Sequence, residues 1–407
     1  HRETFPSWLL LQALRVVKRH PDWTYQDLNR ELGEPVSLVA SGADRALSDT
    51  GWWLAKLNGL GPVVLPSVHT HFPWLAQGEV AELARESNVL TAYDGLVPAA
   101  GPRLDPRATG HAISATALED LAKCPFRHFL KRGLKLDATE EAEPDRDRWL
   151  DPAARGSLLH GLYAAILREL RERKEQADPK RHGAWAHEVA DARLAELRAL
   201  IPPPSTDVFD RERQDLLRDL DLFLRLEAAA KERRPVGFEV SFGGGATEGE
   251  PLAQAEPVMI DLGTGLRFAL RGRIDRIDRL ADGSYETVDY KTGGYWPDNY
   301  TGTFQGGRLL QHALYALAAT QLLRRQDPKA RVSASSYYLP TARGQAERAT
   351  FPAKAAGLED VLRDLFDIVG QGLFVHTADE DDCKFCEVGR ACGRNPYARA
   401  ELKIEND

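Results

Sequence analysis

The segment VDYKTG, residues 288–293, places an aspartate and a lysine two positions apart in a predicted β-strand. Successive side chains of a strand point to opposite faces, so Asp289 and Lys291 share one face. The upstream segment GRIDRID, residues 272–278, supplies Asp275 on a neighbouring predicted strand. An exposed salt bridge needs one charge of each sign and contributes little to stability. Three charged groups converging on one face therefore indicate a functional site.

The loop between these two segments decides whether the aspartates meet. The dipeptide Asp282-Gly283 lies between two strand-like runs, which is typical of a β-hairpin. A two-residue loop would set Asp275 opposite Tyr290. A three-residue loop would set Asp275 opposite Asp289, because a slip of one residue moves every side chain to the other face. We favour the longer loop, since glycine then occupies the position that requires a positive φ.

The two aspartates predict a metal site. Two adjacent carboxylates repel each other unless a cation lies between them. Oxygen-rich sites of this kind suit Mg²⁺ or Mn²⁺. The sequence therefore favours a divalent cation at Asp275 and Asp289.

Length and composition limit the class of protein. A chain of 407 residues, 43% of them hydrophobic, is expected to hold two or three domains. It begins at His1 and its only methionine is Met259, so we expect a piece of a longer or processed polypeptide. No run approaches about 18 apolar residues, which argues against a membrane span, and no signal-peptide pattern occurs. The net charge of -8 argues against a nucleic-acid coat protein, but not against an enzyme that contacts DNA along a channel.

The residue pattern divides the chain into two regions. Residues 1–106 are predicted to be mostly helical and to end in a linker, and residues 107–407 to form a second domain. Ser114 and Thr116 are candidate N-caps of a helix over ALEDLAKCPFRHFLKR, with Glu119 completing a capping box. Further helices are predicted over residues 155–176, 209–234, 308–324 and 357–371, and strands over VGFEVSF, LRFALRGRIDRIDRL and RVSASSYYL. This order indicates an α/β fold with a mixed sheet flanked by helices.

Four segments occur in an order that resembles a known family. They are RGSLLHGLYAAIL (residues 155–167), GRIDRID, VDYKTG and LQHALYA (residues 310–316). Any one of them alone has an ordinary structural reading, such as a solvated strand or a core histidine. Together they resemble the motifs of the PD-(D/E)XK nuclease superfamily, in its RecB and AddB branch, over about residues 107–395. The resemblance implies a restriction-endonuclease-like core and metal-assisted hydrolysis of phosphodiester bonds.

The resemblance also implies a role for each motif residue. The carboxylates of Asp275 and Asp289 would bind the catalytic Mg²⁺ or Mn²⁺. The backbone carbonyl of Tyr290 and the imidazole of His160 would complete its ligands. Lys291 would orient or deprotonate the attacking water and offset the charge that develops on the phosphate.

Three more residues take roles from the same resemblance. Gln311 and Tyr315 lie four residues apart on one helical face and match the family's Q-x-x-x-Y motif. They would support DNA and the active-site lysine. Glu239, in VGFEVSF, lies where the family often carries an acidic residue, and we expect it to have a supporting role.

The cysteines indicate a second metal centre. The four are Cys124 and the close group Cys383, Cys386 and Cys392. A zinc ribbon usually offers two close pairs, whereas here one cysteine is separated from the other three by more than 250 residues. This spacing resembles the iron–sulfur nucleases of the AddB type, in which a [4Fe–4S] cluster joins both ends of the domain. Zinc and free thiols remain the alternatives, and thiolate ligands indicate a reducing, cytoplasmic location.

A run of basic residues surrounds the first cysteine. Lys123, Arg127, Lys131 and Lys135 recur every four residues and would form one stripe on a continuous helix. A solvated helix face is the ordinary interpretation. Beside a nuclease site, the stripe is also a candidate DNA-binding track for phosphates.

These observations lead to a functional prediction. We expect a metal-dependent exonuclease that processes DNA ends in double-strand break repair together with a helicase partner, and no association with membranes. No G-x-x-x-x-G-K-[ST] motif occurs, so an ATP-driven motor would lie in other sequence or in another chain. The alternatives are a non-catalytic DNA-binding scaffold and a stand-alone iron–sulfur nuclease of the antiviral or CRISPR-adaptation type.

Overall fold

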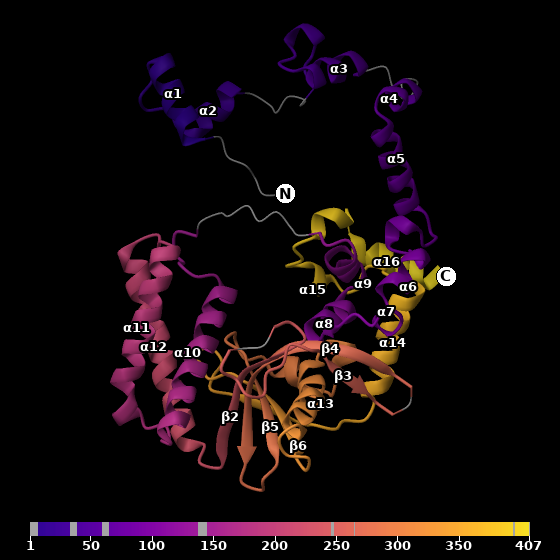
Figure 1. The fold of residues 1–407 in the computed structure, drawn as a ribbon. Coiled ribbons are helices and arrows are strands. Elements are labelled where there is room, and N and C mark those ends of the chain that lie inside the picture. The colour runs from indigo at the N-terminus through magenta and orange to yellow at the C-terminus, as the bar shows by residue number, and fades with distance from the viewer. Residues whose placement is uncertain are drawn as a thin grey trace. The chain divides into compact units, whose positions relative to one another are not determined.

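A computed structural model of the chain describes residues 7–32, 39–58, 65–136, 145–245, 248–263, 265–393 and 395–406. The chain divides into two compact units, residues 1–83 and residues 84–407. Figure 1 labels the helices and strands of the two units.

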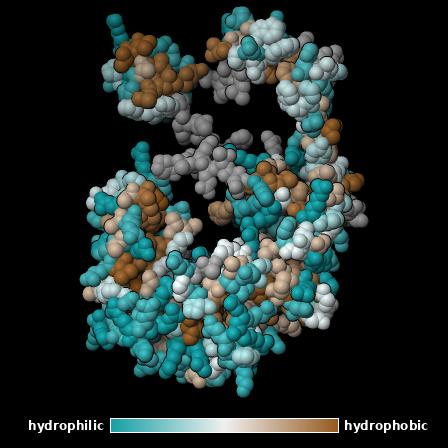
Figure 2. Space-filling view, in the orientation of Figure 1, coloured by the Kyte–Doolittle hydropathy of each residue, from teal (hydrophilic) through white to brown (hydrophobic). Residues whose placement is uncertain are grey.

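The first unit is helical, as the sequence predicts. Its helices are α1 (Trp8–Lys18), α2 (Tyr25–Leu32), α3 (Asp49–Leu57), α4 (Leu65–His71) and α5 (Pro73–Glu86), the last of which continues into the second unit. Among its described residues only Leu11 and Leu28 have buried side chains. Hydrophobic residues of its helices lie on the surface instead (Figure 2). This unit therefore has very little hydrophobic core of its own.

The second unit is built around one long strand, β4 (Arg267–Leu280). Strand β1 pairs with β4 in parallel, and β2, β3 and β5 pair with it in antiparallel orientation. Beyond β5 the sheet continues through parallel β6 and then antiparallel β7. The bounds of these strands are β1 (Ile113–Ser114), β2 (Arg233–Phe242), β3 (Val258–Asp261), β5 (Tyr285–Tyr290), β6 (Val332–Tyr338) and β7 (Arg348–Pro352). The predicted mixed sheet is confirmed.

Helices cover the sheet and create two hydrophobic cores (Figure 1). Helices α8, α13 and α14 form one core with the sheet, in which Leu314 and Ile277 are fully buried, and α10, α11 and α12 form the other, around Phe223 and Val288. The bounds of the helices are α6 (Gly101–Leu104), α7 (Pro106–Thr109), α8 (Ala115–Lys123), α9 (Pro125–His128), α10 (Pro152–Arg173), α11 (Pro179–Leu200), α12 (Thr206–Ala229), α13 (Gln311–Arg324), α14 (Leu358–Gln371), α15 (Glu380–Cys383) and α16 (Pro396–Asn406). Within the described ranges, none of the helices combines the length and the apolar character needed to cross a membrane.

The hairpin between β4 and β5 has the predicted register. Arg276 lies opposite Val288, so the same register continued by one residue sets Asp275 opposite Asp289. Gly283 has a φ of 81°, a conformation that a side chain would strain. The three-residue loop is therefore confirmed.

The long helix predicted after Ser114 is interrupted, however. Helix α8 begins after Ser114, whose hydroxyl accepts the N–H of Ala117, and ends at Lys123. Cys124 then adopts an extended backbone because it precedes Pro125. The chain continues as α9 and a π-helical turn, Phe129–Gly133. The prediction of one continuous helix is wrong.

The boundary between the units differs from the predicted one. The sequence indicated a boundary after residue 106, but residues 84–106 belong to the second unit. The N–H of Val97 donates to the carbonyl of Gly372 at 2.7 Å, and buried Lys403 lies 2.8 Å from Asp94. These contacts join segments about 300 residues apart, so local sequence patterns do not reveal them.

Candidate active site

One cavity of about 820 Å³ gathers the catalytic residues predicted from the sequence. Residues of α10, β2, β4, β5 and α13 form its wall. The predicted residues that line it are His160, Glu239, Asp275, Asp289, Tyr290, Lys291, Gln311 and Tyr315. The fold therefore brings together every one of these predicted residues.

Asp275 is held by the backbone of β5. Its Oδ2 accepts the N–H of Tyr290 at 2.8 Å and lies 3.4 Å from Nδ1 of His160. The side chain of Tyr290 contacts a different partner, because its hydroxyl accepts a hydrogen bond from Arg276 at 3.2 Å within the interior. The backbone of Tyr290 is thus the part that is available to the cavity beside Asp275.

Helix α10 carries His160 to the cavity. Asp151 caps this helix and Pro152 occupies its first turn, where proline is well tolerated. Burial works against protonation of the His160 imidazole. The hydrogen bond and the charge of Asp275 outweigh burial, so the pKa of His160 lies above its ordinary value.

Glu239 contributes more to the cavity than the predicted supporting role requires. One ligand atom each of His160, Glu239 and Asp275 lie within 4.8 Å of one another. Glu239 has a φ of 51°, which is unusual for a non-glycine residue in a strand. Phe238 and Val240 consequently enter different cores, although residues two apart in a regular strand share a face. Burial, followed by the charge of Asp275, raises the pKa of Glu239.

Asp289 and Lys291 form the second part of the site. Lys291 Nζ lies 2.6 Å from Asp289 Oδ2 and donates to Gln311 Oε1 at 2.9 Å. Burial raises the pKa of Asp289, against the lowering effect of the lysine charge. Burial also disfavours the charged form of Lys291, but Asp289 outweighs it and the pKa of Lys291 lies above its ordinary value. The pair is therefore an ammonium beside a buried carboxyl group.

Tyr315 lies one turn after Gln311 and packs against β4. A Cβ atom added to Gly272 would lie 3.0 Å from the Tyr315 ring, so the glycine of GRIDRID leaves room for this side chain. Tyr315 is buried, and burial raises the pKa of its phenol. It therefore remains a neutral hydrogen-bonding group at the wall of the cavity.

Two residues of α8 position Gln311. Glu119 Oε1 accepts the N–H groups of Leu310 and Gln311 at 2.7 and 3.0 Å, and Thr116 Oγ1 accepts from Gln311 Nε2 at 3.2 Å. The predicted capping box of α8 is not the role of these residues, because Ser114 caps that helix. Glu119 instead caps α13, which lies 191 residues further along the chain. That separation explains why the sequence pattern suggested the wrong partner.

The arrangement of strands, carboxylates and lysine agrees with a match to a known family. Residues 112–393 match the family model described as the PD-(D/E)XK nuclease superfamily. The chain belongs to this superfamily. The fold and the family that the sequence motifs indicated are thereby confirmed.

Relatives of this chain are named as one subunit of an ATP-dependent helicase/deoxyribonuclease. The protein of Symbiobacterium thermophilum is 32% identical over 238 residues, which cover 56% of this chain and 19% of the relative. The protein of Moorella thermoacetica is 28% identical over 278 residues (65% and 23%), and that of Limosilactobacillus fermentum 26% over 314 residues (71% and 23%). The matched part is therefore about a fifth of the length of these relatives.

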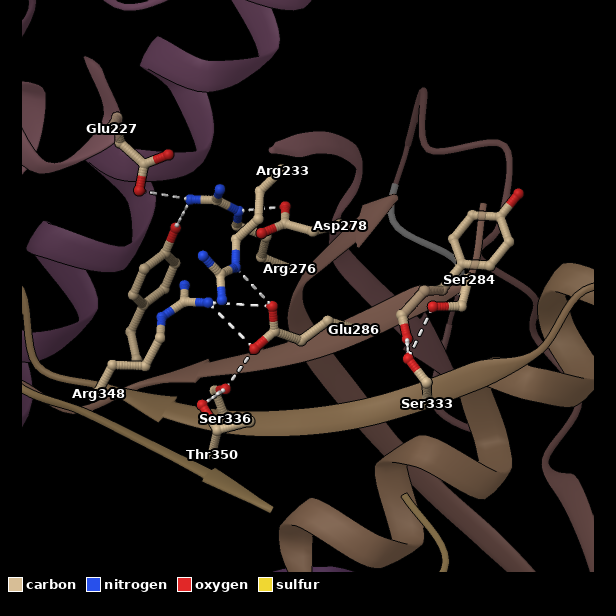
Figure 3. Close-up of polar contacts among 12 residues, drawn as sticks. Glu227, Arg233, Arg276, Asp278, Ser284, Glu286, Ser333, Ser336, Arg348 and Thr350 are labelled. Atoms are coloured by element: carbon tan, nitrogen blue, oxygen red, sulfur yellow. Dashed lines mark hydrogen bonds and ion pairs between the residues drawn. The ribbon is translucent and has the colours of Figure 1, made fainter. Parts of the chain in front are cut away.

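A network of buried charges supports the strands next to the site (Figure 3). Arg276 is fully buried on β4 and lies 2.8 Å from Glu227 of α12. Nearby, Glu286 of β5 accepts hydrogen bonds from Arg233 of β2 at 2.8 Å and from Arg348 of β7 at 3.1 Å. These bonds join β2, β4, β5 and β7, and so fix the strands that carry Glu239, Asp275 and Asp289.

The four cysteines of the chain line one cavity of about 270 Å³. These are Cys124, Cys383, Cys386 and Cys392, and none of them is in a disulfide. Burial raises the pKa of the thiols of Cys124 and Cys383, and that of Cys392 to about 12. Thiols in such surroundings become thiolates when a cation binds them. The fold thus brings the distant cysteine to the other three, as the spacing predicted.

The predicted basic stripe is not formed. Its members are Lys123, Arg127, Lys131 and Lys135. The helix that would carry them breaks before Pro125, so they do not share one helical face. Arg127 and Lys131 instead form ion pairs with Glu387, which lies among the C-terminal cysteines. The prediction of one basic stripe on a continuous helix is wrong, whereas DNA binding by these four residues stays a prediction.

Proposed function

We propose that this chain is a metal-dependent deoxyribonuclease that hydrolyses DNA phosphodiester bonds during the processing of DNA ends. The observation that carries the proposal is the convergence of Asp275, Asp289 and Lys291 with His160 and Glu239 in one cavity. A strand-bound pair of acids followed by a lysine supplies the charges that phosphodiester hydrolysis requires.

The residues present fit a divalent cation. Carboxylate oxygens and an imidazole nitrogen within 4.8 Å of one another are a donor set for Mg²⁺ or Mn²⁺. Burial raises the pKa values of Glu239 and Asp289, because their charged forms are poorly solvated inside the cavity. His160, Glu239 and Asp275 would hold the ion, with Asp289 and the Tyr290 carbonyl next to them. When bound, such an ion supplies Lewis acidity and a lower pKa for water.

The other residues of the site would act on the scissile phosphate directly. The Lys291 ammonium would donate to a phosphate oxygen and offset the negative charge that develops there. Gln311 and Asp289 would hold that ammonium in place, because each contacts it within 2.9 Å. Tyr315 would donate a further hydrogen bond from the wall of the cavity.

The proposal includes a [4Fe–4S] cluster at the cysteines. Four thiolates satisfy such a cluster. One cysteine lies more than 250 residues from the other three, whereas zinc ribbons usually offer two close pairs, and this pattern favours the cluster over zinc. A cluster of this kind suits a cytoplasmic location.

Iron and sulfide analysis, with a visible spectrum of anaerobically purified protein, tests the cluster. We expect broad visible absorbance from the wild-type protein and colourless, less soluble protein from Cys124→Ser, because the link between the distant segments is lost. Stoichiometric zinc without visible absorbance would overturn the cluster, but not the nuclease.

A helicase partner is also part of the proposal. The relatives are named as subunits of an ATP-dependent helicase/deoxyribonuclease. This name supports deoxyribonuclease action beside a helicase motor supplied by other sequence, and we propose that the action is that of an exonuclease in double-strand break repair. A stand-alone antiviral nuclease is the less favoured alternative, because the matched relatives carry the helicase name.

Cleavage of end-labelled linear DNA tests the activity. Single- and double-stranded substrates are incubated with Mg²⁺, with Mn²⁺ or with EDTA. We expect wild-type protein and the matched control Asp261→Asn, an exposed change on β3, to degrade DNA from an end, and Asp275→Asn to lose at least about a hundred-fold in kcat. Equal cleavage by Asp275→Asn would show that the site is wrong. DNA binding without cleavage by any of the three would favour the non-catalytic scaffold.

A further inference from the structure

The first turn of α13 positions the catalytic lysine but has no cap of its own. Gln311, which accepts from Lys291, is the first residue of this helix. Leu310 precedes it, is fully buried and makes no side-chain capping hydrogen bond. Backbone N–H groups at the start of a helix need acceptors from elsewhere when they are buried. The position of Lys291 therefore depends on what holds this turn from outside.

One external support comes from the element that leads to the first cysteine. Glu119 accepts the N–H groups of both Leu310 and Gln311, and Thr116 accepts the side-chain amide of Gln311. Both acceptors lie on α8, whose C-terminal cap is Cys124.

The other support comes from the C-terminal cysteines. Arg308 donates to both carboxylate oxygens of Asp382 at 3.1 and 2.7 Å, and to Asp379 at 3.3 Å. Asp382 directly precedes Cys383 in α15, and it also accepts from Thr377 at 3.0 Å. Its side chain is only 9% exposed. A bidentate, charge-assisted contact to a buried carboxylate is stronger than a surface ion pair.

Close packing leaves the segment before Arg308 little freedom. Gly307 has a φ of 96°, and a Cβ atom there would lie 2.9 Å from Ala122 of α8 and 3.1 Å from Leu365 of α14. The backbone before Arg308 is therefore enclosed by α8 and α14. Displacement of α8 or of the Arg308–Asp382 contact is consequently transmitted to the turn that holds Gln311.

We propose that Arg308 is a positioning residue that couples the cysteine centre to the catalytic lysine. Cys124 and Cys383 end the two elements that support the first turn of α13. A group that draws the cysteines together therefore also fixes Gln311 against Lys291. This inference rests on the proposed nuclease function, in which Lys291 contacts the phosphate. It gives the cysteine centre a part in catalysis that needs no electron transfer.

Steady-state cleavage by Arg308→Ala tests the coupling. The matched control is Lys384→Ala, which removes an exposed ion pair with Asp381 in the same segment. We expect Arg308→Ala to lose on the order of ten- to a hundred-fold in kcat with KM unchanged, because Lys291 is displaced while DNA contacts remain. Iron content and visible absorbance should equal those of the wild type. Arg308→Lys should recover part of the loss, since lysine offers a charge without the planar fork.

Hydrogen–deuterium exchange gives a second readout without DNA or divalent metal. Exchange in the peptide over residues 308–316 should increase in Arg308→Ala and stay at the wild-type level in Lys384→Ala. Removal of iron with a chelator should increase the same exchange in the wild type. It should add little in Arg308→Ala, because the two perturbations act on one contact and are not additive.

The outcomes separate this inference from the proposed function. Unchanged kcat and unchanged exchange in Arg308→Ala would overturn the coupling. So would a loss of activity that merely follows a loss of iron, since that would be a structural effect. If the wild-type protein cleaves no DNA, the proposed function fails, and the exchange measurements still decide whether the cysteine centre holds the turn.

Discussion

Glu239 has a strained backbone conformation, and this conformation places its carboxylate in the cavity. A non-glycine residue with a φ of 51° costs about 1 kcal/mol or more relative to a relaxed strand residue. The same conformation turns its carboxylate toward His160 and Asp275. Proteins retain such strain where function requires it. The contribution of Glu239 to the free energy of unfolding can therefore be tested separately from its contribution to the site.

A matched pair of variants tests this separation. Glu239→Ala and Glu239→Gly both remove the carboxylate, so we expect both to lose divalent-metal-dependent cleavage. Glycine adopts a positive φ without strain, so Glu239→Gly should have a free energy of unfolding about 1 kcal/mol higher than Glu239→Ala. Urea unfolding of the two proteins measures the difference. Equal stability would show that the backbone at this position relaxes when the acid is removed.

At the scale of helices and strands, a prediction from sequence succeeded where the contact that fixes the element is local in the chain. The hairpin register followed from Gly283, because a turn and its two strands lie within one short segment. The motif residues of the cavity were identified differently, from the order of four short segments that together resemble a known family. Sequence reasoning missed the role of Glu119 as the cap of α13, since its partner lies 191 residues away. It also missed the break at Pro125, because the apolar period was allowed to outweigh the restriction that proline places on Cys124.

The network around Glu286 offers a test at this scale. Glu286 accepts hydrogen bonds from Arg233 of β2 and Arg348 of β7. Glu286→Ala would leave two guanidinium groups partly buried without their acid, so we expect the free energy of unfolding to fall by about 3–5 kcal/mol. Glu169→Ala, which breaks an exposed pair with Arg173, should change it by less than about 1 kcal/mol. Chemical unfolding measures both free energies. Similar decreases in Glu286→Ala and Glu169→Ala would contradict a stabilising role of the buried network.

At the scale of the whole molecule, distant segments of the second unit are fastened at several points. Lys403 of α16 contacts Asp94, and the cysteine cavity joins Cys124 to residues 383–392. A cross-link that closes a loop of more than 250 residues stabilises by roughly 5 kcal/mol in the chain-entropy estimate. That is comparable with the net stability of a typical domain. The cluster would therefore stabilise the unit as well as hold the first turn of α13.

Acid should weaken this unit through His128. His128 is buried, Nδ1 contacts the carbonyl of Ala117 at 3.0 Å, and burial lowers the pKa of the imidazole to about 4. Below about pH 6.5 the unfolded chain takes up a proton that the folded chain refuses until about pH 4. The free energy of unfolding therefore falls as the pH decreases through this window, by about 2 kcal/mol at pH 5 from this residue.

Comparison of wild type and variants at pH 7.5 and pH 5 measures the effect. In His128→Asn the fall in the free energy of unfolding between pH 7.5 and pH 5 should be about 2 kcal/mol smaller than in the wild type. His111→Gln, a change of an exposed histidine, should leave the pH dependence as it is in the wild type. The same pH dependence in His128→Asn and the wild type would contradict this assignment.

The position of β4 at the centre of the sheet has a consequence for the order of folding. Its antiparallel neighbour β3 ends a few residues before β4 begins, and β5 begins a few residues after β4 ends, so both pairings close short loops. The pairing with β1 and the meeting of the cysteines close much longer ones. Short loops form first in most chains. We therefore expect the β3–β4–β5 meander to be protected first in pulsed hydrogen exchange during refolding, before the cysteines meet. A newly made chain would then acquire its acidic strands early, and the proposed nuclease site would be complete only when the late-joining cysteines are brought together.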